Sequence, residues 1–149
     1  MRRLFGDRRA VAAAEFAIAV PVVLALMAWI LDFSTMERNR AQLVNGVANA
    51  AQYAILTGTT VNTATLTSIA QKTSMLTGVV ASVAGPGCYC TEYAPTRLVG
   101  ATCGATCGNG NIAATYVTVT ATFNFVPVLP GLSHVVNTTL SESRSVLLQ

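Results

Sequence analysis

The chain has 149 residues, of which 52% are hydrophobic and 10% are charged. This composition argues against a cytosolic enzyme and is typical of a membrane-anchored chain. The formal net charge of +3 comes from residues 1–9, which carry four Arg and one Asp, whereas the remainder carries five basic and five acidic residues. No basic surface for nucleic acid is therefore predicted, and we expect no nucleic-acid partner.

A long apolar segment follows this basic tail. Residues 16–31 contain no charged residue, and residues 10–33 contain two, Glu15 and Asp32. A bilayer core of about 30 Å needs about 20 mainly apolar residues in a helix. The segment 10–33 is therefore predicted to be a transmembrane helix in contact with membrane lipid. Because basic residues close to a span stay in the cytoplasm, residues 1–9 should be cytoplasmic and the rest extracytoplasmic.

A cleaved secretory signal is the alternative explanation of a basic tail followed by an apolar run. Signal peptides usually have an apolar region of about 7–15 residues and end at a small-x-small cleavage site. Here the apolar run ends in Trp-Ile-Leu-Asp-Phe at residues 29–33. A permanent single-pass span is therefore favoured over removal by ordinary signal peptidase.

Two residues stand out within the apolar segment. Glu15 is a carboxylate next to hydrocarbon, where ionised groups are costly and usually paired or functional. It either lies at the headgroup level near Arg8 and Arg9 or pairs with a cation on a neighbouring chain. Pro21 removes one backbone hydrogen bond and is predicted to kink or loosen the helix.

The run Glu15-Phe16-Ala17-Ile18-Ala19-Val20-Pro21, followed by the closing pair Asp32-Phe33, resembles the amino-terminal signature of the TadE-like family. These proteins are pseudopilins or minor pilins of the tight-adherence (Flp, type IVc) pilus system. The resemblance implies a role in pilus assembly, with other pilin-like subunits, the pilus assembly platform and a prepilin peptidase as partners.

The resemblance also implies specific residues. A prepilin peptidase would cut between Ala10 and Val11, where the family usually has Gly at the position of Ala10. Glu15 would then be able to neutralise the new α-amine of Val11 on the next subunit and so set the register, because a buried charge without a partner is costly. Phe16 and Pro21 belong to the same assembly signature.

The helical pattern continues beyond the apolar segment. A single helix is predicted from about Ala12 to Leu56, with residues 34–57 as an extracytoplasmic continuation and Gly58 as the stop. Gly46, Ala50 and Ala54 form a row of small residues at i+4 spacing, which lets helices approach closely. This row packs either on the chain's own domain, which we favour, or on another subunit.

Residues 58–149 are predicted to form one small α+β domain. Residues 62–76 have the pattern of a short amphipathic helix. Strands are expected at 79–84, 116–126 and 137–148, and the middle one alternates strictly between apolar residues and Thr or Asn. The expected fold is α+β and pilin-like, with a long amino-terminal helix, a short second helix and an antiparallel sheet of three or four strands.

The cysteines Cys88, Cys90, Cys103 and Cys107 fall in a predicted loop at 85–111. An even number of cysteines in a small extracytoplasmic domain indicates two disulfides, with three possible connectivities. The nested pairing Cys88–Cys107 and Cys90–Cys103 is slightly favoured over the crossed form. A four-cysteine zinc site is the less favoured alternative, since Cys88-x-Cys90 is one residue short of the usual spacing.

The sequence gives little support for catalysis, and no cofactor is expected. His134 is the only histidine, and the acidic residues show no spacing typical of a catalytic pair. Two functional classes remain. The first is a pseudopilin or minor pilin of the tight-adherence pilus; the second is an uncleaved, membrane-anchored scaffold or adhesion module of the cell envelope.

Overall fold

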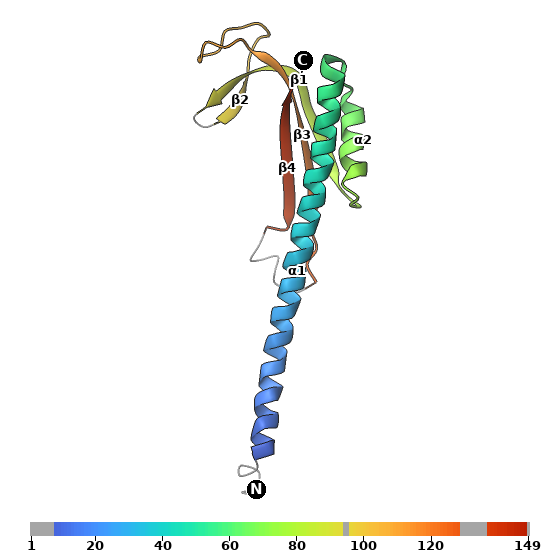
Figure 1. Ribbon diagram of the computed structural model, residues 1–149, viewed down its shortest axis with the longest axis vertical. Helices are drawn as coiled ribbons and strands as arrows, with labels where there is room; N and C mark the ends of the chain where they lie inside the picture. Colours follow the sequence, from blue (N-terminus) through green and yellow to red (C-terminus); the bar gives the residue numbers. More distant parts are fainter. Residues whose placement is uncertain (1–7, 94–95, 129–136, 149) are drawn as a thin grey trace.

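The computed structural model describes residues 8–93, 96–128 and 137–148. Within them, a long helix is followed by a 3-10 turn, a short helix and an antiparallel sheet of four strands (Figure 1). This arrangement confirms the predicted α+β, pilin-like fold. The elements are α1 Arg8–Thr57, η2 Gly58–Thr60, α2 Thr63–Thr73, β1 Val80–Tyr93, β2 Thr96–Gly100, β3 Ala114–Asn124 and β4 Thr139–Leu147.

Helix α1 has 50 residues, which corresponds to about 75 Å at 1.5 Å per residue. It begins before the predicted Ala12 and ends one residue after the predicted Leu56. Gly58 follows with φ +60°, a left-handed conformation that glycine adopts without steric cost. Pro21 lies inside the helix and does not end it.

The outer part of α1 packs on α2 and on the sheet. Leu43, Val47, Ala50 and Ala54 of α1 are buried in one core with Leu66 of α2. The row of small residues thus packs on the chain's own domain, as we favoured. The amino terminus of α2 is capped by Asn62, whose Oδ1 accepts hydrogen bonds from two backbone amides in the first turn.

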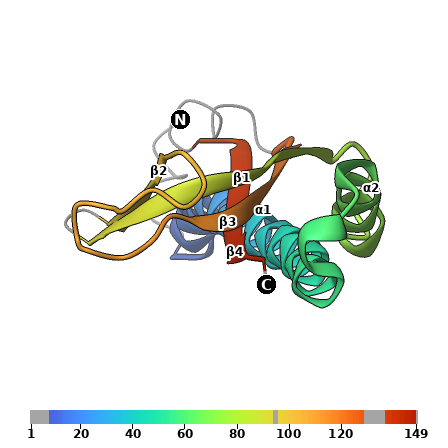
Figure 2. The ribbon, with the colours of Figure 1, turned by 90° about the horizontal axis from the view of Figure 1, so that it is seen from above.

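The sheet has the strand order β2-β1-β3-β4, and α1 and α2 pack against one of its faces (Figure 2). The central strand β3 shows the predicted alternation: Val117, Val119 and Ala121 are fully buried, and the Thr side chains between them are half-buried on the other face. At the edge, Arg40 of α1 and Glu142 of β4 form an ion pair at 2.7 Å. The hydrogen bond and charge of Glu142 raise the pKa of Arg40.

Strand β1 is longer than predicted. The sequence pattern ended the strand at residue 84, before Gly85-Pro86-Gly87, but β1 continues to Tyr93. The register with β3 shifts between Ala84 and Gly87. This bulge takes Pro86, which has no N–H to donate, out of the ladder, so the strand can resume beyond it.

Strand β2 was not predicted from the sequence at all. It pairs antiparallel with the second half of β1, from Tyr89 opposite Gly100 to Tyr93 opposite Thr96. The predicted cysteine loop at 85–111 was therefore wrong at its amino-terminal end. That part consists largely of two paired strands, and the connection between β2 and β3 is the loop that remains.

Candidate functional site

The amino-terminal half of α1 is not covered by the rest of the described chain. Residues 11–31 are exposed apart from Val20 and Ala28, which are half-buried, and the first buried residue is Asp32. Figure 1 shows this half of the helix projecting from the domain. In the described part of the chain, α1 is long and apolar enough to cross a membrane, with a mean hydropathy of 2.3 in its most apolar window. A soluble chain would bury such a surface, so a lipid or protein environment is needed for it.

The predicted assembly residues lie along this uncovered half. Val11, Glu15, Phe16 and Pro21 are all exposed. Ala10 belongs to α1, but its side chain lies outside the described residues. Among the residues that the structure describes, none forms an ion pair or hydrogen bond with the Glu15 carboxylate. The fold of a single chain therefore leaves Glu15 available to another molecule.

A shallow apolar groove runs along the same part of α1. Phe16, Val20, Val23 and Met27 line it with the smaller Ala19. Small residues between larger ones allow another helix to approach closely. The groove can therefore accept a neighbouring apolar helix or a lipid chain.

A comparison with protein families tests the resemblance carried by this segment. Residues 10–52 match the family of TadE-like proteins. The TadE-like segment thus covers α1 from Ala10 to Gln52, including the uncovered half and most of the part that packs on the domain. Comparisons with curated proteins and with solved structures gave no match.

Asp32 of the TadE-like segment has a structural role that the sequence analysis did not identify. Its side chain is only 2% exposed, and its Oδ1 accepts a hydrogen bond of 3.0 Å from the backbone N–H of Val128. This bond attaches the chain beyond β3 to α1, where the covered part of the helix begins. The sequence signal was an isolated acid directly after an apolar run, which we used only as part of the family signature.

The four cysteines form the disulfides Cys88–Cys103 and Cys90–Cys107. This is the crossed pairing, so the favoured nested pairing was wrong. All four sulfur atoms are bonded in disulfides, so none is a free thiolate of the kind that a four-cysteine zinc site needs. In the described residues, no group of three or more His, Cys, Asp and Glu side chains is placed to hold a metal ion.

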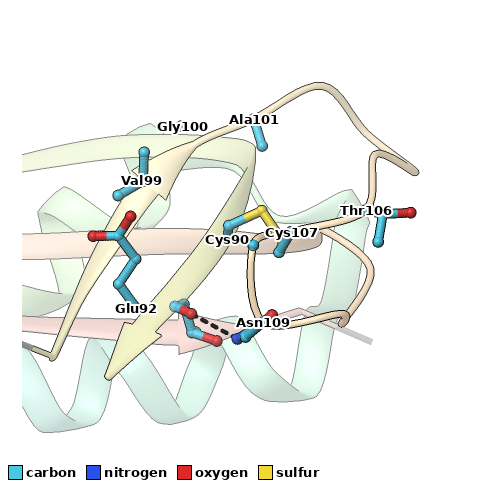
Figure 3. Close-up of a pocket in the computed structure, with 10 residues that line it drawn as sticks. Cys90, Glu92, Val99, Gly100, Ala101, Thr106, Cys107 and Asn109 are labelled. Carbon is cyan, nitrogen blue, oxygen red and sulfur yellow. Dashed lines mark hydrogen bonds between the residues drawn. A yellow bond between two sulfur atoms is a disulfide. The ribbon is translucent and has the colours of Figure 1, made fainter. Parts of the chain in front are cut away.

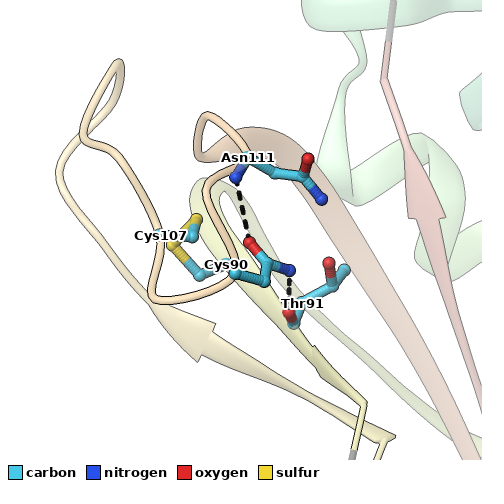
Figure 4. Close-up of a disulfide and its surroundings, with 5 residues drawn as sticks. Cys90, Thr91, Cys107 and Asn111 are labelled. Atoms are coloured by element: carbon cyan, nitrogen blue, oxygen red, sulfur yellow. Dashed lines mark hydrogen bonds between the residues drawn. A yellow bond between two sulfur atoms is a disulfide. The ribbon is translucent and has the colours of Figure 1, made fainter.

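The unpredicted hairpin of β1 and β2 explains the crossed pairing. Because β2 runs antiparallel to β1, the chain returns to the level of Cys88, where the N–H of Ala101 donates to the Cys88 carbonyl at 2.9 Å. Cys103 follows directly and bonds Cys88. The loop then turns back along β1, so Cys107 reaches Cys90 (Figure 4).

The loop that carries Cys103 and Cys107 borders a groove beside β2. Glu92, Val99 and Gly100 line one side of this groove, and Thr106 and Asn109 line the other (Figure 3). Asn109 holds the loop in place, since its Nδ2 donates to the Thr91 carbonyl at 2.9 Å and its Oδ1 accepts from the Asn111 N–H at 3.1 Å. Glu92, the carboxylate of the groove, is paired with Arg97 at 2.6 Å.

Two tyrosines, one on β1 and one on β3, pack against each other. Tyr89 and Tyr116 contact each other edge to face, with ring centroids 6.4 Å apart. Both are half-buried, which agrees with an ordinary packing role. His134 lies outside the described residues.

Proposed function

We propose that this TadE-like chain is a pseudopilin or minor pilin that acts in the assembly of a tight-adherence (Flp, type IVc) pilus. The observation that carries the proposal is the uncovered apolar half of α1, which coincides with the start of the TadE-like match. A rigid helix with an apolar face that its own domain does not cover is suited to packing among similar helices. Other pilin-like subunits and the pilus assembly platform are the proposed partners.

In this proposal the chain is anchored in the bacterial inner membrane. Residues 10–33 cross the bilayer, residues 1–9 remain in the cytoplasm, residues 34–57 continue the helix outside, and residues 58–149 form the extracytoplasmic domain. The two disulfides support this orientation, since disulfides persist in oxidising compartments such as the periplasm.

Glu15 has a specific role in the proposal. Cleavage between Ala10 and Val11 by a prepilin peptidase would create a free α-amine four residues before Glu15. The Glu15 carboxylate of one subunit then neutralises the Val11 amine of the next. In apolar surroundings an unpaired charge costs several kcal/mol, so this pair would select one register between neighbouring helices.

The test is co-purification of the chain with pilus components from membranes of its native host. Glu15→Ala should abolish co-purification and leave membrane insertion intact. Glu37→Ala is the matched control, because Glu37 is an exposed acid on the same helix beyond the apolar half, and it should have no effect. Unchanged co-purification of Glu15→Ala would refute the pilin role and leave an uncleaved, membrane-anchored scaffold or adhesion module.

A further inference from the structure

The chain that follows β3 presents two apolar side chains to the surroundings. Val126 and Val128 are 82% and 86% exposed. Between them lies Pro127, and before them Phe125 is buried, with its N–H bonded to the Thr138 carbonyl at 2.8 Å. We call Val126 and Val128 the boundary pair. The backbone next to this pair is held in place, so the exposure of the two side chains is a feature of the fold.

The hydrogen bond to Asp32 gives the boundary pair a defined position along α1. Val128 donates its N–H to Asp32, the first buried residue after the apolar half of the helix. Figure 1 shows the chain beyond β3 running beside α1 toward the projecting half of the helix. The boundary pair is therefore the part of the described domain that lies where the uncovered apolar surface ends.

The length of the apolar segment predicts the depth of this point in a bilayer. From Val11 to Leu31 the helix covers about 30 Å at 1.5 Å per residue, which is the thickness of the hydrocarbon core. Asp32 then lies at the outer boundary between hydrocarbon and headgroups. Trp29, which is 47% exposed one turn earlier, has the position typical of the aromatic residues at this boundary.

We propose that the boundary pair inserts into the outer headgroup and acyl-chain boundary of the same membrane that α1 crosses, as a second contact between the domain and the lipid. The proposal rests on the membrane span in the proposed function. The absence of charged residues supports lipid as the partner of this pair, since the sequence from Phe125 to Leu140 contains no Asp, Glu, Lys or Arg. With Asp32 as the link, this contact would fix the orientation of the domain on the membrane and not merely its distance from it.

The experiment uses the full chain in phosphatidylcholine and phosphatidylglycerol vesicles, with lipids that carry a nitroxide quencher just below the headgroup. Trp29, the single tryptophan, is first replaced by Phe. Single tryptophans are then introduced as Val128→Trp, Thr139→Trp and Leu56→Trp. Leu56 is as exposed as Val128, at 86%, but lies at the far end of α1, and Thr139 is an exposed residue at the start of β4.

We expect strong quenching for Val128→Trp, weaker quenching for Thr139→Trp and almost none for Leu56→Trp. Val126→Trp is the second reporter and should behave like Val128→Trp. The graded series controls for the preference of tryptophan itself for the membrane boundary, because a preference alone would also draw in the tryptophan at residue 139.

The chain with its natural Trp29 separates the two possible failures. If Trp29 is quenched but Val128→Trp and Val126→Trp are no more quenched than Leu56→Trp, the membrane span holds and the boundary pair faces water or a protein partner. If Trp29 is also unquenched in the vesicles, the span itself is wrong, and the inference falls with it. Equal quenching at residues 128 and 139 would also overturn the inference. It would show the preference of tryptophan for the membrane boundary and not the position of the boundary pair.

Discussion

Gly46 of α1 lies directly against the backbone of α2 at Ala70. A β-carbon at Gly46 would stand 2.5 Å from the Ala70 carbonyl oxygen and 2.9 Å from the β-carbon of Ser74. The Ala70 carbonyl oxygen belongs to the backbone of α2, so it cannot move aside as the end of a flexible side chain could. The close approach of the two helices therefore depends on the absence of a side chain at position 46.

This contact predicts that Gly46→Ala destabilises the domain. In an exposed helix the same change usually stabilises by about 1 kcal/mol, but here the helices must separate, at a cost of about 1–3 kcal/mol. The midpoint of thermal unfolding in detergent should fall by at least several degrees. Asn45→Ala, on the exposed side of the same turn, should leave it unchanged or raise it slightly. A more stable Gly46→Ala variant would contradict the α1–α2 packing.

The disulfide connectivity can be tested by peptide mapping of the unreduced protein. Cleavage after Tyr89 by chymotrypsin and after Ala105 by elastase separates Cys88 from Cys90 and Cys103 from Cys107. Mass spectrometry should then find one linked peptide pair with Cys88 and Cys103 and another with Cys90 and Cys107. Peptides linking Cys88 to Cys107 would instead show the nested form and contradict the path of the loop after β2.

Asp32 is predicted to hold the chain beyond β3 through the Val128 N–H. Asp32→Ala removes the acceptor, and a buried or half-buried amide without a partner costs about 1–3 kcal/mol. Hydrogen exchange of the Val128 amide should become faster, and the domain should unfold at a lower temperature. Asp32→Asn keeps a carbonyl acceptor of the same size, so it should retain much of the protection. If Asp32→Ala exchanges at the wild-type rate, the bond does not hold this segment.

The mature amino terminus is the most direct check of the pilin role. Mass spectrometry of the protein from native membranes should show a chain that begins at Val11. Ala10→Gly restores the residue that the family usually has at this position, so it should be cleaved at least as completely. An intact Met1 in the natural chain, with cleavage only of Ala10→Gly, would indicate that this protein acts as a permanently anchored assembly factor.

Much of the fold could be predicted because it depends on local patterns. The long helix was visible in the apolar run and in the helical pattern that continues beyond it, and Gly58 marked its end. The central strand was visible in the alternation from Val117 to Phe125. In both cases the period of the apolar residues matches the period of the backbone, so a short window of sequence carries the information.

The errors have a different origin. The pattern ended β1 at Gly85-Pro86-Gly87 because these residues usually mark a turn. The structure instead absorbs Pro86 in a bulge, which only the register with β3 reveals. Strand β2 was missed because Thr96–Gly100 is short and has no clear alternation. Its pairing with β1 is what brings Cys103 to Cys88, so the missed strand and the wrong disulfide pairing are one error.

By itself the sequence determined the long helix with its apolar amino-terminal half, the TadE-like signature, the short second helix, the central strand and the expectation of a pilin-like fold. Only the tertiary structure decided that Gly46 packs on α2, that the disulfides are crossed and that Asp32 holds the chain beyond β3. The physical reason is the range of the interactions. Periodicity acts within a few residues along the chain, whereas the Asp32–Val128 bond joins groups 96 residues apart, and such contacts exist only once the elements have packed.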